Sequence, residues 1–371
     1  MTQALRLALG TASALGFARF AYGLLLPAMR DDLRWSLAQA GAMNTANGLG
    51  YLIGALLTAA VVRRLGTAAA FRWGMVLTAV ALAATALTSD YPTLLVFRAA
   101  AGVTGAVVFI TGGVIAARSP SRAAIPVYFA GSGLGIVVSG AAIPALGAHW
   151  RAGWVGLGVA AGLAAWLSWR AATDGDTPTT ATGRARVLPL WRTALAYLLF
   201  AAGYITYITF LSAYLADQNA PVVQVALTWT VLGAAVAAVP TLWSRPISRW
   251  PGSTALAAIL ALLAGASALA LLSPALPVVL ASAVGYGATF LGVPAAVTTL
   301  IKRDTPPADW TATLAAFTTL FAAGQTAGPW IAGVLADLTS TGATVAWTAV
   351  LCAAGAAIAV TEHRPHPAPR V

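Results

Sequence analysis

The sequence predicts an all-α polytopic membrane protein, with twelve transmembrane helices in two pseudo-symmetric six-helix halves. The composition indicates a membrane protein, because the 371 residues are 59% hydrophobic and only 8% charged, whereas soluble domains are about 25% charged. Apolar runs recur along the whole chain, and each can cross a hydrocarbon core of about 30 Å. Basic residues concentrate in alternate loops, which requires an even number of spans.

The first six spans are expected at residues 4–29, 37–62, 70–88, 92–117, 122–146 and 151–171. The last six are expected at residues 192–216, 222–243, 253–272, 275–300, 308–336 and 342–360. These spans define an N-terminal half over residues 1–171 and a C-terminal half over residues 190–362. Residues 172–189 between them are polar and rich in Thr and Ala, which is typical of a flexible linker. Residues 363–371 form the expected cytoplasmic tail.

The basic residues predict the orientation. Most of the 21 Lys and Arg residues fall on one side of the membrane, and the other side has only Arg30, Arg34 and Arg151. Short loops rich in Lys and Arg stay cytoplasmic, so we expect the linker and both termini on the cytoplasmic side of the inner membrane. A net charge of +11 would indicate nucleic acid in a soluble protein. Here the loop positions explain the charge without such a partner.

The inventory of reactive side chains argues against an enzyme. The single lysine, Lys302, is not preceded by glycine and so belongs to no G-K-[ST] phosphate loop. The histidines His149, His363 and His366 lie near loops or in the tail and form no H-E-x-x-H site. One cysteine, Cys352, excludes an intrachain disulfide and a cysteine-cluster metal site. We therefore predict no catalytic residue, no metal site and no cofactor.

Two arginines lie in the middle of apolar runs, Arg19 in the first span and Arg98 in the fourth. An arginine at the bilayer centre costs about 2.5–3.5 kcal/mol and normally faces a protein interior or a watery cavity. The ten acidic residues all fit at helix ends, in loops or in the tail, so no carboxylate shares the hydrocarbon with these arginines. We interpret Arg19 as a ligand for an anionic substrate, and the alternative is a latch on backbone carbonyls. For Arg98, helix coupling is favoured over substrate contact.

Polar and aromatic residues on other spans are candidates to complete the site. The second span places Asn44, Asn47 and Tyr51 on one helical face. The seventh carries an aromatic stripe in which the hydroxyls of Tyr204 and Tyr207 favour a cavity wall over simple packing. Buried amides in lipid need a partner, either a neighbouring helix or a substrate. Further candidates are Tyr22, Tyr128 and Gln325.

An internal repeat relates the halves. Residues 16–20 (GFARF) match residues 203–207 (GYITY). Glycines of the fifth span match those of the eleventh, namely Gly131 with Gly324, Gly135 with Gly328 and Gly140 with Gly333. Both alignments pair one span with the span six places later, as two six-helix halves require.

Motif residues resemble those of the major facilitator superfamily. Its arginine–glycine motif in span four is similar to Arg98, Gly102 and Gly105. Its cytoplasmic loop signature between spans two and three is similar to Arg63, Arg64 and Gly66. Arg63 stands where an aspartate is usual, so this sequence departs from the signature at a residue of the charge interlock that the loop provides in relatives.

A closer resemblance is to the YbfB/YjiJ-like branch of that superfamily. It rests on residues 16–23 (GFARFAYG), Thr45-Ala46-Asn47 with Gly50-Tyr51, residues 203–205 (GYI), and Gly324-Gln325 with Gly328-Pro329. The resemblance covers nearly the whole chain and implies no particular substrate. We expect gating or conformational roles for Arg63, Arg64, Gly66, Gly102, Gly105, Gly135, Gly328 and Pro329.

The leading functional hypothesis is a monomeric secondary active transporter that moves a small organic anion by alternating access. Guanidinium groups bind carboxylate or phosphonate oxygens bidentately. No embedded carboxylate or histidine is found in the spans for proton antiport, so exchange, uniport or symport of a substrate-borne proton fits better. The alternative is a proton-coupled exporter of neutral or cationic drugs or metabolites, which would use peripheral groups such as Asp31 or Asp32.

Overall fold

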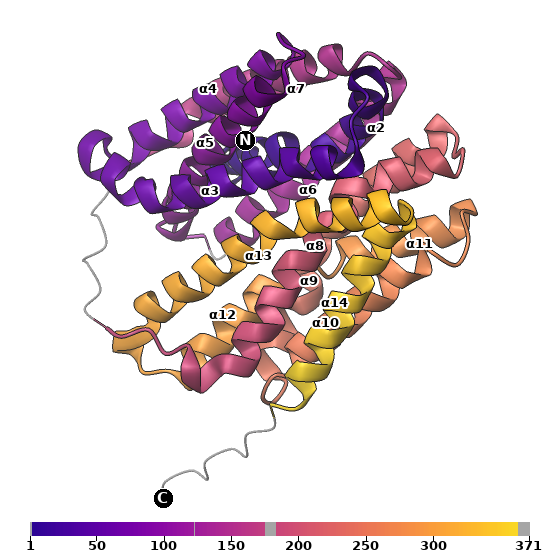
Figure 1. Cartoon of the computed structure of the whole chain (residues 1–371). Coiled ribbons are helices and arrows are strands. Elements are labelled where there is room, and N and C mark those ends of the chain that lie inside the picture. The colour runs from indigo at the N-terminus through magenta and orange to yellow at the C-terminus, as the bar shows by residue number, and fades with distance from the viewer. Residues whose placement is uncertain (1, 122, 175–182, 363–371) are drawn as a thin grey trace, which may run out of the picture.

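The computed structural model describes residues 2–121, 123–174 and 183–362, which form helices joined by short loops (Figure 1). Ten helical segments in these residues are long and apolar enough to cross a membrane. Two further helices, α10 (Thr254–Leu269) and α13 (Trp310–Leu338), complete the twelve expected spans. The predicted all-α membrane fold is therefore confirmed. The expected tail, residues 363–371, and residues 175–182 of the expected linker lie outside the described residues.

The first half contains spans one to six. Span one consists of α1 (Gln3–Thr11), the π-helical segment η1 (Ala12–Phe20) and α2 (Tyr22–Leu33). Spans two to six are α3 (Leu37–Leu65), α4 (Thr67–Thr85), α5 (Tyr91–Ala117), α6 (Ala124–Ala142) and α7 (Trp150–Ser168). Short 3-10 turns follow the last two, η2 (Pro144–Leu146) and η3 (Trp169–Ala171).

The second half contains spans seven to twelve. The 3-10 turn η4 (Leu188–Leu190) leads into α8 (Trp191–Asp217), which is followed by α9 (Val222–Arg249) and α10. Span ten consists of α11 (Leu276–Gly287) and α12 (Gly292–Asp304). The turn η5 (Pro307–Asp309) precedes α13, and α14 (Gly342–Val360) is the last helix.

Local sequence signals explain where helices begin and end. The side chains and backbone N–H groups of Ser36 and Gln39 pair reciprocally at the start of α3, which is a capping box. The carboxylate of Asp90 accepts the backbone N–H of Thr93 at the start of α5. Helix α3 ends at Gly66 with φ of +83°, a conformation that costs glycine little. The helix ends therefore follow from the loop sequences.

Two spans depart from continuous α-helices. In η1, hydrogen bonds reach back five residues, as from the Ala21 N–H to the Gly16 oxygen at 2.9 Å. In span ten, residues 288–291 form a turn between α11 and α12. The indole N–H of Trp243 on α9 donates to the Ala288 oxygen at 2.7 Å. A hydrogen-bond partner from a neighbouring helix thus stabilises the break.

Small residues set equivalent helix contacts in both halves. A Cβ on Gly135 of α6 would collide with the Ala12 backbone of span one. A Cβ on Gly328 of α13 would collide in the same way with the Ala202 backbone of α8. Because Gly135 and Gly328 are matched by the sequence repeat, these contacts agree with two pseudo-symmetric halves.

The closest contacts between the two halves lie toward one side of the membrane. Gly140 of α6 lies against Trp229 of α9, and Gly333 of α13 against Leu37 of α3. The Asp337 carboxylate accepts the first two backbone N–H groups of α3 at 2.7 and 2.9 Å. Helices α3 and α13 approach each other toward these ends and diverge toward the opposite ends (Figure 1). We name the first side the closed side, and the other, where most Lys and Arg lie, the basic side.

Candidate functional site

Arg19 lies inside the π-helical segment of span one. Its side chain is only 2% exposed, although apolar residues surround it along the chain. π-Helical turns are rare and occur often at functional sites. The position of Arg19 therefore combines a buried charge with an unusual backbone, and the π-helical backbone was not predicted from the sequence.

The Arg19 guanidinium is incompletely paired. Its Nε and Nη2 atoms have no hydrogen-bond partner among the described residues. Its carbon Cζ lies 5.6 Å from the centre of the Tyr51 ring on α3, a cation–π contact. A buried donor without a partner costs about 1–3 kcal/mol, and more when it is charged. An acceptor that is absent from the chain itself would remove this cost.

Two predicted residues from other helices lie near Arg19, and a third is joined to them by a hydrogen bond. Tyr51 on α3 and Tyr204 on α8 lie close enough to interact electrostatically with its charge. The Tyr204 hydroxyl donates to the Gln325 Oε1 atom of α13 at 3.2 Å. The amide Nε2 of Gln325 is buried and has no partner among the described residues. These four residues, Arg19, Tyr51, Tyr204 and Gln325, form the Arg19 cluster, which joins the two halves.

An aromatic wall supports the second-half side of this cluster. The ring of Tyr204 stacks on those of Phe200, Phe321 and Phe290, with centroids 4.9, 5.5 and 5.9 Å away. Phe290 in turn contacts Phe20 of the first half edge-on at 5.8 Å. Stacked rings are rigid and apolar. The cluster thus presents charged and amide donors beside an apolar surface.

Arg98 on α5 is also buried, and the protein binds two of its three guanidinium nitrogens, while its Nε has no partner among the described residues. Its Nη1 donates to the Ala18 oxygen at 2.7 Å, and its Nη2 reaches the Asn44 Oδ1 atom at 3.5 Å. Its Cζ lies 5.0 Å from the ring centre of Trp154 and 5.2 Å from that of Tyr22. These contacts couple α5 to span one and α3. The Arg98 charge also acts on that of Arg19, so two like charges lie near each other, with no carboxylate of the described residues paired with either.

The two asparagines of α3 connect helices. Asn44 donates from Nδ2 to the Thr209 hydroxyl of α8, across the two halves. Asn47 donates from Nδ2 to the Arg98 oxygen at 3.1 Å, within the first half. Tyr22, also on the list of sequence candidates, donates to the Ala40 oxygen at 2.7 Å. The two asparagine amides and the Tyr22 hydroxyl therefore each have a protein partner. Contact of these three residues with substrate stays a prediction.

The hydroxyls of Tyr207 and Tyr128 are buried and bind groups outside the Arg19 cluster. The Tyr207 hydroxyl pairs with that of Ser282 on α11 at 2.7 Å, and its ring stacks on Tyr286 at 4.1 Å. Tyr128 on α6 donates to the Phe109 oxygen of α5 at 2.7 Å. Each hydroxyl thus has its hydrogen-bond partner within its own half. Hydrogen-bond partners on other helices cannot be predicted from the spacing of residues along one helix. The sequence therefore did not show that Tyr207 and Tyr204 have different surroundings.

The residues expected to act in conformational change lie at helix contacts or helix ends. Gly102 of α5 lies against Asn47 of α3, and Gly105 lies near Ala14 of η1. The Pro329 oxygen lies against Gly41, at the contact between the halves. Arg63 and Arg64 are exposed at the end of α3. In the described residues the neighbouring Gly66 lies against Asp174, whose carboxylate accepts the Ala68 N–H at 2.9 Å.

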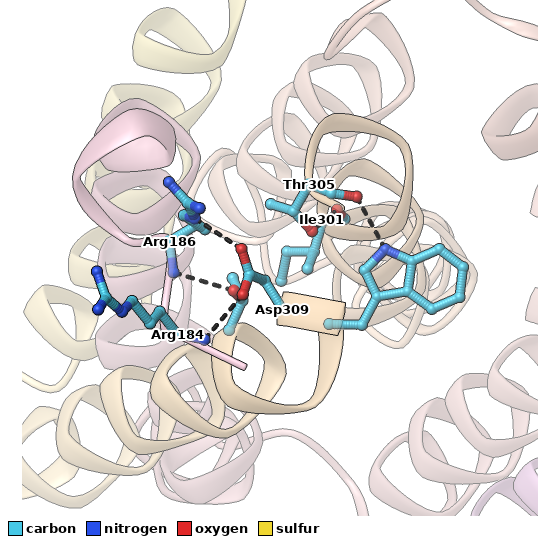
Figure 2. A network of polar contacts seen from close by, with 7 residues as sticks. Arg184, Arg186, Ile301, Thr305 and Asp309 are labelled. Carbon is cyan, nitrogen blue, oxygen red and sulfur yellow. Dashed lines mark hydrogen bonds and ion pairs between the residues drawn. The ribbon is translucent and has the colours of Figure 1, made fainter. Parts of the chain in front are cut away.

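A second polar network, on the basic side, was not predicted from the sequence (Figure 2). Asp309 in η5 accepts the Arg184 backbone N–H at 2.8 Å and the Arg186 Nε at 2.7 Å. The Arg186 N–H donates to the Thr313 hydroxyl at 3.0 Å. The Arg184 N–H, followed by the Arg186 side chain, lowers the pKa of Asp309 below its ordinary value. The end of the expected flexible linker is therefore anchored to the second half.

The described acidic side chains lie at the ends of helices, as the sequence suggested. Asp32 near the end of α2 accepts the Trp150 indole N–H at 2.8 Å and pairs with Arg151 at 3.5 Å. Asp217 at the end of α8 lies 4.0 Å from Arg30. Within the described part of the chain, the Arg19 cluster therefore contains no carboxylate.

Comparisons with known proteins agree with the fold. The model of a family described as "Uncharacterised MFS-type transporter YbfB" matches residues 11–362. No curated protein matches the sequence.

Several solved structures have a similar fold. A bacterial homologue of the human lysosomal transporter Spinster, inward-facing and unoccupied, aligns with TM-score 0.72 and 16% identity over 98% of each chain. The nucleoside transporter NupG aligns with TM-score 0.71 and 14% identity over 96% of this chain and 97% of that one. The human organic anion transporter MFSD10 (TETRAN) aligns with TM-score 0.64 and 18% identity over 96% of this chain and 100% of that one. At such identities the similarity shows the fold alone.

Proposed function

The chain belongs to the YbfB-type family of major facilitator superfamily transporters, and we propose that it moves a small organic anion across the membrane by alternating access. The Arg19 cluster is the proposed site. The observation that carries the proposal is that three buried donors of this cluster have no partner among the described residues, namely Arg19 Nε and Nη2 and Gln325 Nε2. A carboxylate or phosphonate offers acceptors only, which matches donors of this kind.

The charges around the site support an anion over a cation or a neutral compound. Arg19 and Arg98 repel each other in a buried region, and the described residues of the cluster include no compensating carboxylate. A bound anion would neutralise part of this charge, whereas a bound cation would add to it. The stacked rings beside Tyr204 suit the apolar body of an organic anion.

The distribution of the cluster over both halves supports alternating access. Arg19 and Tyr51 belong to the first half, and Tyr204 and Gln325 to the second. In secondary transporters the site lies near the bilayer midplane, and the halves rock around it. A substrate that contacts both halves is therefore released when they separate. Among solved structures of the same fold, one is a human organic anion transporter, so the fold is compatible with such a cargo.

We further propose that coupling uses the substrate rather than a protein carboxylate. Asp32, the group expected for a proton-coupled exporter, is engaged with Trp150 and Arg151 at the membrane edge. Exchange of anions, uniport or symport of a proton on the substrate needs no titrating group beside Arg19. The protein acts as a monomer in this proposal, because one chain contains both halves.

The basic side is proposed to be cytoplasmic, in the inner membrane, because short loops rich in Lys and Arg stay inside. Cysteine labelling tests this orientation. Cys352 is buried, so Thr179→Cys provides a single reactive site in the segment between the halves. We expect an impermeant maleimide to label it only after the cells are permeabilised. Labelling of this site in intact cells would show that the orientation is the opposite of the proposed one.

A thermal-stability screen of the purified protein tests the substrate class. Carboxylates are compared with their own amides, for example benzoate with benzamide and nicotinate with nicotinamide, at constant ionic strength. A ligand at 100 times its Kd stabilises the protein by about 2.7 kcal/mol. We expect at least one acid to raise Tm while its amide does not. If amides or organic cations raise Tm and acids do not, the proposal is wrong.

A further inference from the structure

A groove of about 600 Å³ lies on the second half, away from the Arg19 cluster. Its walls come from α9, α10 and α11, and include Leu242, Pro246, Trp250 and Leu262. Leu242, Trp250 and Leu262 are exposed in the protein, as side chains are when they face lipid. From Leu242 to Trp250 the groove follows α9 for about 12 Å. It therefore extends from the membrane edge at the basic side into the hydrocarbon region.

Small residues keep the groove open. A Cβ on Gly265 of α10 would meet no atom within 4 Å. Gly285 of α11 faces Ala266 of α10 closely, so these two helices cannot supply large side chains at that level. The void is therefore a property of the helix surfaces, and a side chain at Gly265 would fill it without displacing a neighbour.

The polar groups at the bottom of the groove already have partners. The Ala288 oxygen, freed by the break in span ten, accepts the Trp243 indole N–H at 2.7 Å. The Thr289 hydroxyl donates to the Gly285 oxygen at 2.7 Å. The groove therefore offers no buried polar atom of these residues to a polar ligand or to water, which needs two to four polar partners. A hydrocarbon chain is the occupant that suits these walls.

Positive charge lies at the end of the groove on the basic side. Arg245 and Arg249 are exposed and stand one turn apart on α9, next to the lining residues Pro246 and Trp250. Neither arginine takes part in the ion pairs of the described residues. Tryptophan at this level is typical of the membrane interface. Basic residues beside an interface attract anionic lipid head groups.

We propose that this groove binds one acyl chain of an anionic phospholipid, whose phosphate contacts Arg245 and Arg249. The lipid comes from the leaflet at the basic side. The binding site is built within the second half alone, so a lipid bound there would stay with that half while the two halves move. It is independent of the anion proposed for the Arg19 cluster.

Native mass spectrometry of delipidated, full-length protein tests the proposal. Dioleoylphosphatidylglycerol and dioleoylphosphatidylcholine are added separately, and the affinity for the first retained lipid is compared. We expect wild type to prefer phosphatidylglycerol by roughly tenfold or more. The variant Gly265→Phe should lose this first site for both lipids, because the ring fills the groove. Gly162→Phe on α7, where a Cβ also meets nothing within 4 Å, is the matched control and should bind as wild type does.

The double variant Arg245→Gln/Arg249→Gln gives an independent result. It should lose the preference for phosphatidylglycerol and still bind phosphatidylcholine, with a smaller loss of affinity than for phosphatidylglycerol, because the groove is intact and the choline cation already offsets the phosphate charge. Wild-type affinity in Gly265→Phe would show that the groove is not the lipid site. An unchanged preference for phosphatidylglycerol in the double variant would show that these arginines do not bind the head group. Either result overturns the proposal.

Discussion

At the scale of single residues, two buried arginines of the same charge have different surroundings. Arg98 donates from two nitrogens to Ala18 and Asn44 and packs against Trp154, and only its Nε is without a partner among the described residues. Arg19 leaves two nitrogens without a partner and contacts the face of Tyr51. A fold gains nothing from an unpaired buried charge. The difference supports the proposal that Arg98 holds helices together and that Arg19 binds the substrate.

Substitution of Arg19 should separate binding from folding. Arg19→Lys keeps the charge but loses the planar fork, so we expect an affinity for the anion at least tenfold weaker. Arg19→Ala removes an uncompensated charge, and its Tm should equal or exceed that of wild type. Arg98→Ala is the comparison, and its Tm should fall because the Asn44 and Ala18 groups lose their partner. A fall in Tm for Arg19→Ala as large as that for Arg98→Ala would make Arg19 a latch.

The two tyrosines of the α8 stripe should behave differently when their hydroxyls are removed. Tyr204→Phe frees the Gln325 amide and should weaken anion binding about five- to tenfold, the equivalent of one hydrogen bond. Tyr207→Phe removes the bond to Ser282 and should cost about 1 kcal/mol of stability with unchanged affinity. Binding titrations and thermal unfolding of both variants measure this. If Tyr207→Phe weakened anion binding and Tyr204→Phe lowered only the stability, Tyr207 and not Tyr204 would lie at the substrate.

At the scale of helices, the segment after residue 182 is fastened to η5 by one carboxylate. Because Arg184 and Arg186 lower the pKa of Asp309, this anchor is complete above the ordinary Asp value of about 3.9. It is lost as the pH falls below that value, through the lowered pKa of the folded protein.

A spin label at Ala185 reports on this anchor. We expect low mobility from neutral pH down to about pH 4 and higher mobility only below it. Asp309→Asn should make the label mobile at every pH. Asp304→Asn, which affects a neighbouring ion pair with Arg303, is the control and should leave the mobility unchanged at neutral pH. A mobile label at pH 7 in wild type would contradict the anchor.

The helices show what the sequence could and could not predict. Long apolar runs placed most of the span ends to within a few residues. The π-helical segment around Arg19 and the turn at residues 288–291 were not foreseen, because their stretches are as apolar as regular spans. For the site, Arg19, Tyr204 and Gln325 were identified one by one. Their convergence depends on how α8 and α13 pack, which no single span encodes.

At the scale of the whole molecule, the two halves are held together at the closed side by a carboxylate of one half on a helix start of the other. Asp337 on α13 accepts two N–H groups at the start of α3. Such bonds are worth about 1.5–3 kcal/mol each because the acceptor is charged. The exposed pair between Arg30 and Asp217, at 4.0 Å, contributes little by comparison.

Removal of Asp337 should therefore shift the conformational equilibrium. We expect Asp337→Ala to raise the population that is open at the closed side by at least tenfold, since about 1.4 kcal/mol suffices for that factor. Arg30→Gln is the control and should change this population little. Pulsed EPR distances between labels on the loops after α4 and α10 measure the populations. Equal distance distributions in Asp337→Ala and wild type would show that this contact does not hold the closed side.

Counterflow in proteoliposomes tests the central claim most directly. The vesicles are loaded with the acid that gives the largest thermal shift, and uptake of the same acid in labelled form is followed. We predict that wild type accumulates the labelled acid, that its amide is not exchanged, and that folded Arg19→Ala is inactive. Accumulation by Arg19→Ala at the wild-type rate, or equal exchange of the amide by wild type, would contradict transport of an anion bound by Arg19.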